Sequence, residues 1–397
     1  MHPLRLSHLI ILLFFLSTTA VWAGDHQPQL PRDFALTEAP LLVPRLSPQW
    51  TVSALGQQWT LELEETSRPL RHLTPSQRRQ VQQSGGRFFV GTVEGRLDSW
   101  VRLSVHGHHW SGGFDDGEAT YLIESAQAVL ADTDPRSNDA NLIAVFRMAD
   151  LDHAIHIDDG GIRPPADAWF PQAPRGPALD GFLESLRATG RQVTQDIPVT
   201  VVTDTEFNTA HGSNVAAVVA SRMHFVDGLY TAQMGVGIAL YHLEILTNNG
   251  PLTSTNGGQL LAAFADFVQA EATIPFVGLA HLFTGKSLGP AGLAYFSPLL
   301  CNSAFGYGWN RNLSSNVLSS MVIAHEIGHN LNAPHDGDGD CSDEPFRGVM
   351  SAVLSSNIPQ EFSPCSVTVI QPSIAAGASC LVPREDLDGV FWDRFED

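Results

Sequence analysis

The chain has 397 residues, of which 43% are hydrophobic and 16% are charged. This composition is typical of globular proteins rather than disordered chains, and the length suffices for two ordinary domains. The formal net charge of −20 argues against nucleic acid and anionic membrane surfaces as partners.

The first 23 residues are predicted to be a signal peptide. Arg5 lies in a short basic region, an apolar run follows from Leu9 to Leu16, and Val21 and Ala23 supply the small residues of a cleavage site before Gly24. The apolar run is shorter than the roughly 20 residues that a membrane-spanning helix needs. We therefore expect cleavage and export, with no later segment apolar and long enough to span a membrane.

Residues 24–190 are predicted to form a β-rich propeptide followed by a linker. Apolar residues alternate or cluster within 87–95, 99–105 and 119–124, which indicates strands, with turns at Gly112-Gly113 and Asp116-Gly117. The stretch from Asp158 to Pro177 is rich in Gly, Pro and Asp, a composition typical of a linker.

From Asp196 onward the pattern changes to alternating strands and helices. Strands are predicted at 197–204, 236–246 and 292–296, and helices at 214–229, 259–270 and 317–331. Strands that alternate with helices indicate an α/β layer.

The last predicted helix carries two histidines four residues apart, His325 and His329. A helix turns about 100° per residue, so the two side chains lie about 40° apart on one face and can reach one Zn²⁺ ion. Glu326 projects off that face, where it can take a proton from the attacking water.

A third histidine, His335, can join the same ion only if the helix ends before it. Had the helix continued, His335 would lie about 15 Å along the axis from His325. Pro334 disfavours helical backbone angles at the preceding residue. Asn332 tolerates the left-handed angles at which helices commonly end. The sequence therefore predicts a three-histidine zinc site with an open fourth position.

All four cysteines lie in the last quarter of the chain, at positions 301, 341, 365 and 380. In an exported chain this even number favours two disulfides, for which three pairings are open.

The segment 325–336 reads H-E-I-G-H-N-L-N-A-P-H-D and resembles the metzincin consensus HExxHxxGxxH. Its flanks resemble the reprolysin or adamalysin branch, the catalytic domain of snake-venom metalloproteinases and ADAM proteases. Four other segments also resemble segments of that branch: 281–285, 292–301, 348–352 and 362–366. The resemblance covers about residues 196–382, and 89–104 resembles the reprolysin propeptide.

This resemblance implies a metzincin-like catalytic domain over 191–383, with a mixed twisted sheet and a zinc-site helix. It implies one catalytic Zn²⁺ on His325, His329 and His335, with Glu326 as the catalytic base. It implies structural support from Asn332, Asp336 and Met350, with Met350 beneath the zinc. It also implies a substrate-binding edge strand at Gly292, Leu293, Ala294 and Tyr295. Finally, it implies the disulfides Cys301–Cys380 and Cys341–Cys365.

The sequence departs from this family pattern in three places. Asn332 stands where the consensus has glycine. Pro198 and Gly278 align where venom enzymes have calcium-binding acidic residues, so we expect no such calcium site. No cysteine precedes Ala178, so a thiolate on zinc cannot enforce latency.

The function expected is that of a secreted zinc metalloendopeptidase, made as a proenzyme, that cleaves internal bonds of extended protein substrates. The alternative is a zinc-binding pseudo-protease that captures a partner without cutting it, although a retained Glu326 argues against this. A further alternative is a secreted binding protein that acts through the β-rich unit. The acidic, aromatic tail at 384–397 resembles the tails of some exported bacterial proteins and suggests a bacterial export route.

Overall fold

The computed structural model describes residues 33–40, 49–130, 134–147, 150, 155–158, 160–170, 172–187, 193–345, 347–354 and 361–384. The predicted signal peptide and the predicted tail beyond Arg384 lie outside these ranges. Among the described residues, no helix is both long enough and apolar enough to cross a membrane.

The first part of the described chain is an antiparallel sheet of eight strands, in the order β1-β8-β7-β6-β5-β4-β3-β2. Its strands are β1 Ala35–Glu38, β2 Gln49–Ala54, β3 Gln57–Glu65, β4 Arg87–Val93, β5 Trp100–His106, β6 His109–Asp115, β7 Thr120–Ser125 and β8 Leu142–Phe146. Between β3 and β4 lie η1, Arg68–Leu70, and α1, Pro75–Gln83; α2, Ala126–Val129, follows β7. The predicted β-rich unit is thus a sheet, with large aromatic side chains in the core of one face.

The predicted turn at Gly112-Gly113 is wrong, because both glycines lie inside β6. A Cβ atom on Gly112 would lie 2.1 Å from the carbonyl oxygen of Arg102, and one on Gly113 would lie 2.4 Å from that of Tyr121. These glycines therefore allow close backbone approach by the neighbouring strands rather than a chain reversal. The turn predicted at Asp116-Gly117 is present, closed by a hydrogen bond from Asp116 N–H to the Ala119 carbonyl.

The second part of the chain contains a six-stranded mixed sheet, in the order β11-β10-β12-β14-β13 with β16 paired to β10. Its strands are β10 Gln195–Thr203, β11 Gly237–Ile245, β12 Leu279–Thr284, β13 Gly292–Ala294, β14 Tyr307–Arg311 and β16 Val382–Pro383. The helices of this part of the chain are α3 Pro177–Arg187, α4 Thr205–His211, α5 Val215–Met234, α6 Gly257–Ala270, α7 Asn316–Asn330 and α8 Pro364–Ala376. The short strand β13 is antiparallel to β14 and ends the sheet at the edge.

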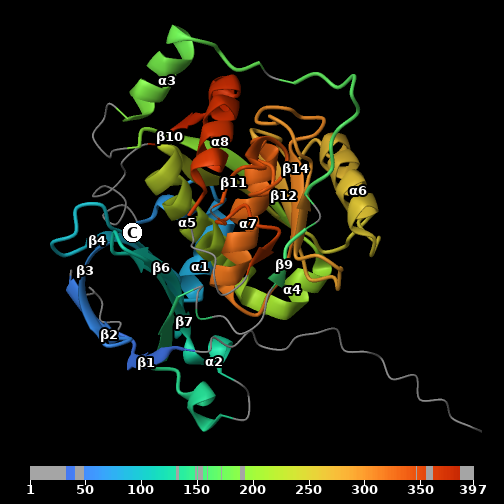
Figure 1. The fold of residues 1–397 in the computed structure, drawn as a ribbon. Coiled ribbons are helices and arrows are strands. Elements are labelled where there is room, and N and C mark those ends of the chain that lie inside the picture. Colours follow the sequence, from blue (N-terminus) through green and yellow to red (C-terminus); the bar gives the residue numbers. More distant parts are fainter. Residues whose placement is uncertain are drawn as a thin grey trace, which may run out of the picture.

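Helices α5 and α7 lie between the two sheets, and α6 covers the other face of the second sheet (Figure 1). Of the 20 residues of α5, 17 are buried, and it extends to Met234, five residues beyond the predicted end. A helix that is apolar on all sides must be buried on all sides. Here one hydrophobic cluster runs from Phe88 and Leu122 of the first sheet, through α5 and α7, to Ile197 of the second.

Buried charges also join the two parts of the chain. Asp227 of α5 accepts from Arg102 of β5 at 3.2 Å and from both terminal nitrogens of Arg384 at 2.7 and 2.9 Å. Arg384 also pairs with Asp196. Burial would raise the pKa of Asp227, but the two arginines hold it well below its usual range. Arg384, assigned to the tail by the predicted boundary, therefore belongs structurally to this buried network.

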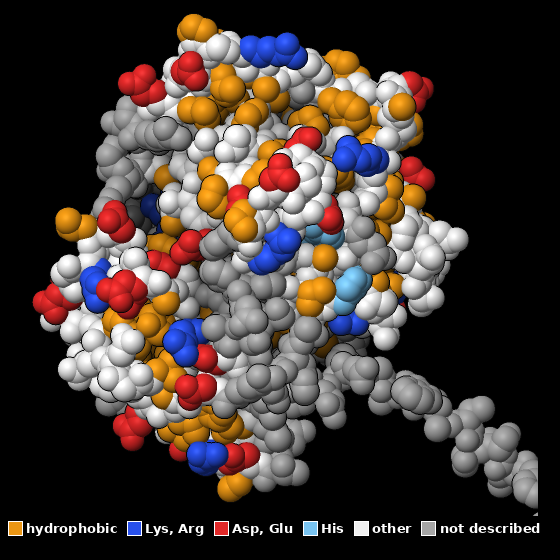
Figure 2. Space-filling view, in the orientation of Figure 1, with side chains coloured by type: hydrophobic (Ala, Val, Ile, Leu, Met, Phe, Trp, Pro, Cys, Tyr) orange, Lys and Arg blue, Asp and Glu red, His pale blue; other side chains and the backbone are white. Residues whose placement is uncertain are grey.

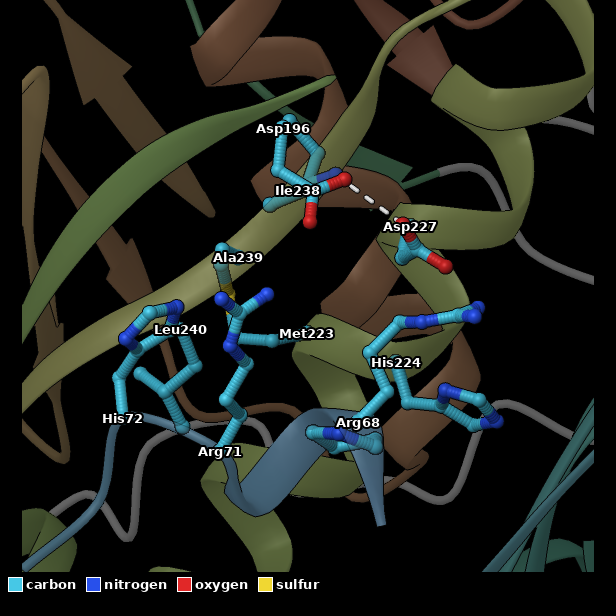
Figure 3. A pocket seen from close by; sticks show the side chains of 11 residues that line it. Arg68, Arg71, His72, Asp196, Met223, His224, Asp227, Ile238, Ala239 and Leu240 are labelled. Carbon is cyan, nitrogen blue, oxygen red and sulfur yellow. Dashed lines mark hydrogen bonds between the residues drawn. The ribbon is translucent and has the colours of Figure 1, made fainter. Parts of the chain in front are cut away.

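A cavity of about 20 Å³ lies beside this network. Figure 3 shows Arg68, Arg71 and His72 approaching α5 and β11 from η1 and the residues that follow it. On the outer surface, the face drawn in Figure 2 carries acidic and basic side chains interspersed, so the negative charge is not gathered into one patch there.

Glu124 of β7 is a second polar contact between the parts. Its Oε1 accepts from Val317 N–H and from the Ser315 hydroxyl, both at 2.7 Å, so it satisfies donors at the N-terminus of α7. Burial raises the pKa of Glu124 to about 7.

This raised pKa predicts that Glu124 weakens the fold as pH rises. Between about pH 4.5 and pH 7 the folded chain keeps a proton that the unfolded chain has released, so the contribution to stability falls by up to about 3 kcal/mol across that window. Glu124→Gln should remove this part of the pH dependence. Denaturant unfolding between pH 4.5 and pH 8 measures it. The exposed control Glu118→Gln should match the wild type, and equal slopes for Glu124→Gln and wild type would refute the prediction.

Candidate metal centre

Helix α7 places His325 and His329 on one face, with ring centroids 4.7 Å apart. Both are fully buried. Nδ1 of His325 lies 2.7 Å from the Val349 carbonyl oxygen, and Nδ1 of His329 lies 2.7 Å from that of Ala333. Because a carbonyl can only accept, each Nδ1 carries the proton, and each Nε2 is left with a free lone pair.

The helix ends as the sequence predicts. Asn332 has a φ of 72°, in the left-handed region. Its N–H donates to the His329 carbonyl at 2.9 Å, and Ala333 N–H donates to the Gly328 carbonyl at 3.0 Å, which is a Schellman motif. The reversal brings the ring of His335 to 5.2 Å from His325 and 5.1 Å from His329, measured between centroids.

Substitutions at Asn332 should follow the cost of left-handed backbone angles. That cost is roughly 1–2 kcal/mol for residues other than glycine and asparagine, so Asn332→Val should lower the free energy of unfolding by about this amount. Asn332→Gly should be neutral or raise it by less than about 1 kcal/mol. Urea unfolding of the two variants tests this. A valine variant as stable as the glycine variant would contradict the expected backbone conformation.

The three histidines fit a zinc ion. Nε2 of His325 and Nε2 of His329 are buried and have no hydrogen-bond partner. One ring nitrogen from each of the three histidines and a carboxylate oxygen of Asp158 all lie within 4.8 Å of one another. Burial lowers the pKa of His325 to about 4, which keeps its imidazole neutral, as a metal ligand must be. Three imidazoles converging on one point are a donor set suited to Zn²⁺.

Glu326 lies next to this centre in the sequence and is also fully buried. Neither carboxylate oxygen has a hydrogen-bond partner. Burial, assisted by the charge of Asp158, raises its pKa well above the usual range. Gly292 of β13 packs on it, since a Cβ atom there would lie 2.2 Å from Oε1 of Glu326. An unpartnered buried carboxylate is poised to exchange a proton.

Met350 packs against helix α7 beside the histidine centre, and Asp336 is hydrogen-bonded to the backbone around Met350. A Cβ atom on Gly328 would lie 2.4 Å from the sulfur of Met350, so Met350 packs directly under the helix between the two histidines. Asp336 N–H donates to the Met350 carbonyl at 3.0 Å. The Asp336 carboxylate accepts from Gly348 N–H at 2.7 Å and from the Ser363 hydroxyl at 2.6 Å.

Strand β13 holds three of the four predicted edge-strand residues, Gly292, Leu293 and Ala294. Tyr295 follows it and donates its N–H to the Tyr307 carbonyl. The edge of β13 that faces away from β14 is hydrogen-bonded to another segment of the same chain. The Ile157 carbonyl accepts from Gly292 N–H at 3.0 Å, and Ile162 N–H donates to the Ala294 carbonyl at 2.8 Å.

Asp158 is the residue of this centre that the sequence analysis missed. It was assigned to a linker, but it is fully buried, with Oδ1 at 2.6 Å from Nε2 of His335 and Oδ2 at 3.2 Å from Nε2 of His329. Burial would raise the pKa of Asp158, but the histidines around it hold it well below its usual range. The linker prediction is therefore wrong for its first residues. Two aspartates followed by two glycines were the only local signal.

The structure contains both disulfides that the resemblance implies, Cys301–Cys380 and Cys341–Cys365. The first ties the segment after β13 to the chain beyond α8. The second ties the acidic loop after His335 to the start of α8. All four cysteines, like the histidine centre, belong to the second part of the chain, and neither disulfide involves the first sheet.

Comparison with known proteins agrees with this geometry. Residues 193–363 match a reprolysin family described as Metallo-peptidase family M12. Human disintegrin and metalloproteinase domain-containing protein 33 is 28% identical over 390 residues, which cover 93% of this chain and 46% of that protein. Human disintegrin and metalloproteinase domain-containing protein 9 is 28% identical over 207 residues, or 49% and 24%.

The chain thus spans less than half the length of these curated relatives. Among solved structures, metalloproteinase-II from Bacteroides fragilis aligns with a TM-score of 0.46 and 11% identity, over 81% of this chain and 90% of its own. The M12 match contains helix α7, which carries His325, Glu326 and His329, and also contains His335. Residues 193–363 therefore match the reprolysin-type, ADAM-like metzincins of metallopeptidase family M12.

Proposed function

We propose that this protein is a secreted, zinc-dependent endopeptidase that hydrolyses internal peptide bonds of extended protein substrates and is made as a proenzyme. One observation carries the proposal. Three buried imidazoles converge on one point, with no hydrogen-bond partner on Nε2 of His325 or of His329, and the unpartnered carboxylate of Glu326 lies beside them on α7.

Zinc held by His325, His329 and His335 would act as a Lewis acid on the scissile carbonyl and lower the pKa of water at the site. Glu326 takes a proton from the attacking water and returns it to the leaving amine. Burial raises the pKa of Glu326, so it holds the transferred proton more readily than an exposed carboxylate would.

Strand β13 supports the choice of an extended peptide as substrate. It is the edge strand of its sheet, and its outward-facing backbone groups already bond to an extended segment of the same chain. A substrate backbone would add to this edge as a further strand, by β-augmentation. That requires the segment now bonded to Gly292 and Ala294 to leave, which is the reason for proposing a proenzyme.

Export rests on the predicted signal peptide at 1–23, and the aromatic tail favours a bacterial route. Substrates of this enzyme would be proteins or peptides. The strongly negative net charge disfavours nucleic acid.

The test uses full-length protein activated by limited proteolysis and incubated with casein or a quenched fluorescent peptide. Cleavage should appear, disappear on addition of a zinc chelator, and return when zinc is restored. The absence of chelator-sensitive cleavage would leave zinc-dependent capture without cutting as the function.

A further inference from the structure

Helix α7 ends at Asn330, the residue directly after His329 of the histidine centre. The Asn330 side chain is fully buried and reaches the chain that follows the edge strand β13. Its Nδ2 donates to the Tyr295 carbonyl at 2.8 Å and to the Tyr307 carbonyl at 3.1 Å. Tyr295 follows β13, and Tyr307 is the first residue of β14. One amide therefore links the end of the histidine-bearing helix to the edge strand and to its neighbour.

The backbone at the end of α7 is bonded to the same segment. Leu299 N–H donates to the Asn330 carbonyl at 2.8 Å, and Ser297 N–H donates to the His329 carbonyl at 3.3 Å. The last carbonyls of a helix have no partner within the helix. Here the chain after β13 supplies partners for two of them, so the edge strand and the end of α7 are fixed to one another.

A buried histidine of the sheet orients the Asn330 side chain. Nε2 of His281, in β12, lies 3.0 Å from Oδ1 of Asn330, and Nδ1 of His281 lies 3.0 Å from Nδ2 of Asn310 in β14. Because the two carbonyls beside Asn330 can only accept, its Nδ2 must face them and its Oδ1 must face His281. Nε2 of His281 therefore carries the proton and donates it, and Nδ1 accepts from Asn310.

The surroundings of His281 keep it neutral and fixed in place. It is fully buried, and burial lowers its pKa to about 4. A Cβ atom on Gly308 would lie 2.6 Å from Cε1 of His281, so the ring lies against the backbone of β14, where a side chain would collide with it. Oδ1 of Asn310 has no hydrogen-bond partner among the described residues, so the network ends there. Side chains from β12, β14 and α7 thus form one chain of hydrogen bonds with a defined direction.

We propose that Asn330 is a positioning residue that aligns the edge strand β13 with the zinc ion, and that His281 holds Asn330 in the orientation this requires. This inference rests on the proposed function and deepens it, because it names the contact that sets a substrate backbone opposite the metal. The distance of a peptide on β13 from the zinc ion depends on the distance between Tyr295 and His329. A misplacement of about 1 Å can cost on the order of 100-fold in rate. The effect of Asn330 on the reaction therefore passes through β13.

The test uses the chain activated by limited proteolysis and loaded with Zn²⁺, and it compares two hydroxamate probes by titration calorimetry. Acetohydroxamate contacts the zinc ion alone, whereas a tripeptide hydroxamate also pairs its backbone with the edge strand. Asn330→Leu keeps a branched side chain but forms no hydrogen bond. It should weaken binding of the tripeptide probe by at least about tenfold and binding of acetohydroxamate by less than about twofold. A role in stability alone would leave the ratio of the two affinities unchanged.

His281→Leu and His281→Gln form a matched pair that leaves the residues of α7 and β13 unaltered. Glutamine can donate to Oδ1 of Asn330 as Nε2 of the histidine does, so it should keep the tripeptide affinity within about twofold of the wild type, whereas leucine should weaken it by at least about threefold. These variants keep the proposal testable if Asn330→Leu does not fold. Asn248→Leu changes an exposed asparagine after β11, at the opposite edge of the sheet, and should match the wild type.

An unchanged ratio of the two affinities in Asn330→Leu would overturn the proposal, and so would equal tripeptide affinities of His281→Leu and His281→Gln. Loss of zinc from Asn330→Leu would overturn it as well, because the residue would then support the metal and not the strand. Peptide cleavage is scored separately on the same samples. If the wild type binds both probes but cuts no peptide, the proposed endopeptidase is refuted, while the affinity ratio still decides the role of Asn330.

Discussion

Glu326→Gln should lower kcat/KM for peptide cleavage by about 100- to 10,000-fold, the range contributed by a positioned general acid–base group. The amide has nearly the shape of the carboxylate but cannot take a proton from water. Because the side chain has no hydrogen-bond partner, the change breaks no contact of the described structure. Zinc content should stay at the wild-type level, since the three histidines are untouched.

The measurement compares activated wild type and variant on one quenched peptide, with metal analysis on the same samples. Glu271→Gln, an exposed glutamate at the end of α6, serves as the matched control and should retain full activity. An active Glu326→Gln enzyme with full zinc would show that another group moves the proton.

Asp227→Ala should lower the free energy of unfolding of the full-length chain by about 3–5 kcal/mol, the cost of breaking a buried ion pair by removing one partner. The substitution leaves Arg102 and Arg384 buried near each other without the carboxylate that both contact. It also removes the acceptor for Ile238 N–H. The expected loss therefore comes from stranded charge and not from lost volume.

Arg102→Leu should cost less than Asp227→Ala, because Asp227 would still pair with Arg384. At the surface, Glu118→Ala breaks the exposed ion pair with Arg96 and should leave stability unchanged. Chemical denaturation of the three variants orders these effects. A loss for Asp227→Ala as small as that for Glu118→Ala would mean that the buried network does not hold the two parts together.

The histidine centre was predictable because most of it is local. His325 and His329 are one helical turn apart, so helix geometry alone places them together. Asn332 and Pro334 lie at the turn that ends the helix, and Asn332 adopts the left-handed backbone angles expected of it. The positions of β10, β11 and β13, and of helices α5, α6 and α7, likewise follow from short-range apolar patterns, whereas β12 and β14 were not predicted.

Asp158 shows where such reasoning ends. It lies 177 positions before His335 in the sequence, and its Gly-rich surroundings are as typical of a linker as of a tight turn. Only the packing of residues 155–158 and 160–162 against β13 and against the short strand β15, Val353–Leu354, distinguishes the two. The turn predicted at Gly112 and Gly113 was wrong for a related reason. Glycine occurs both in turns and where neighbouring strands approach closely, so the residue type alone does not distinguish the two.

The sequence by itself determined that His325 and His329 lie together, that Glu326 is adjacent, and that the helix ends where His335 can join them. These features depend on contacts within about ten residues, whose geometry the backbone restricts. The tertiary structure decided that α5 is enclosed by two sheets, that Asp227 holds arginines from distant segments, and that Asp158 reaches the histidines. Those contacts join segments far apart in the chain. Bringing such segments together closes long loops, and this produces no periodic pattern of residues that could be recognised in the sequence.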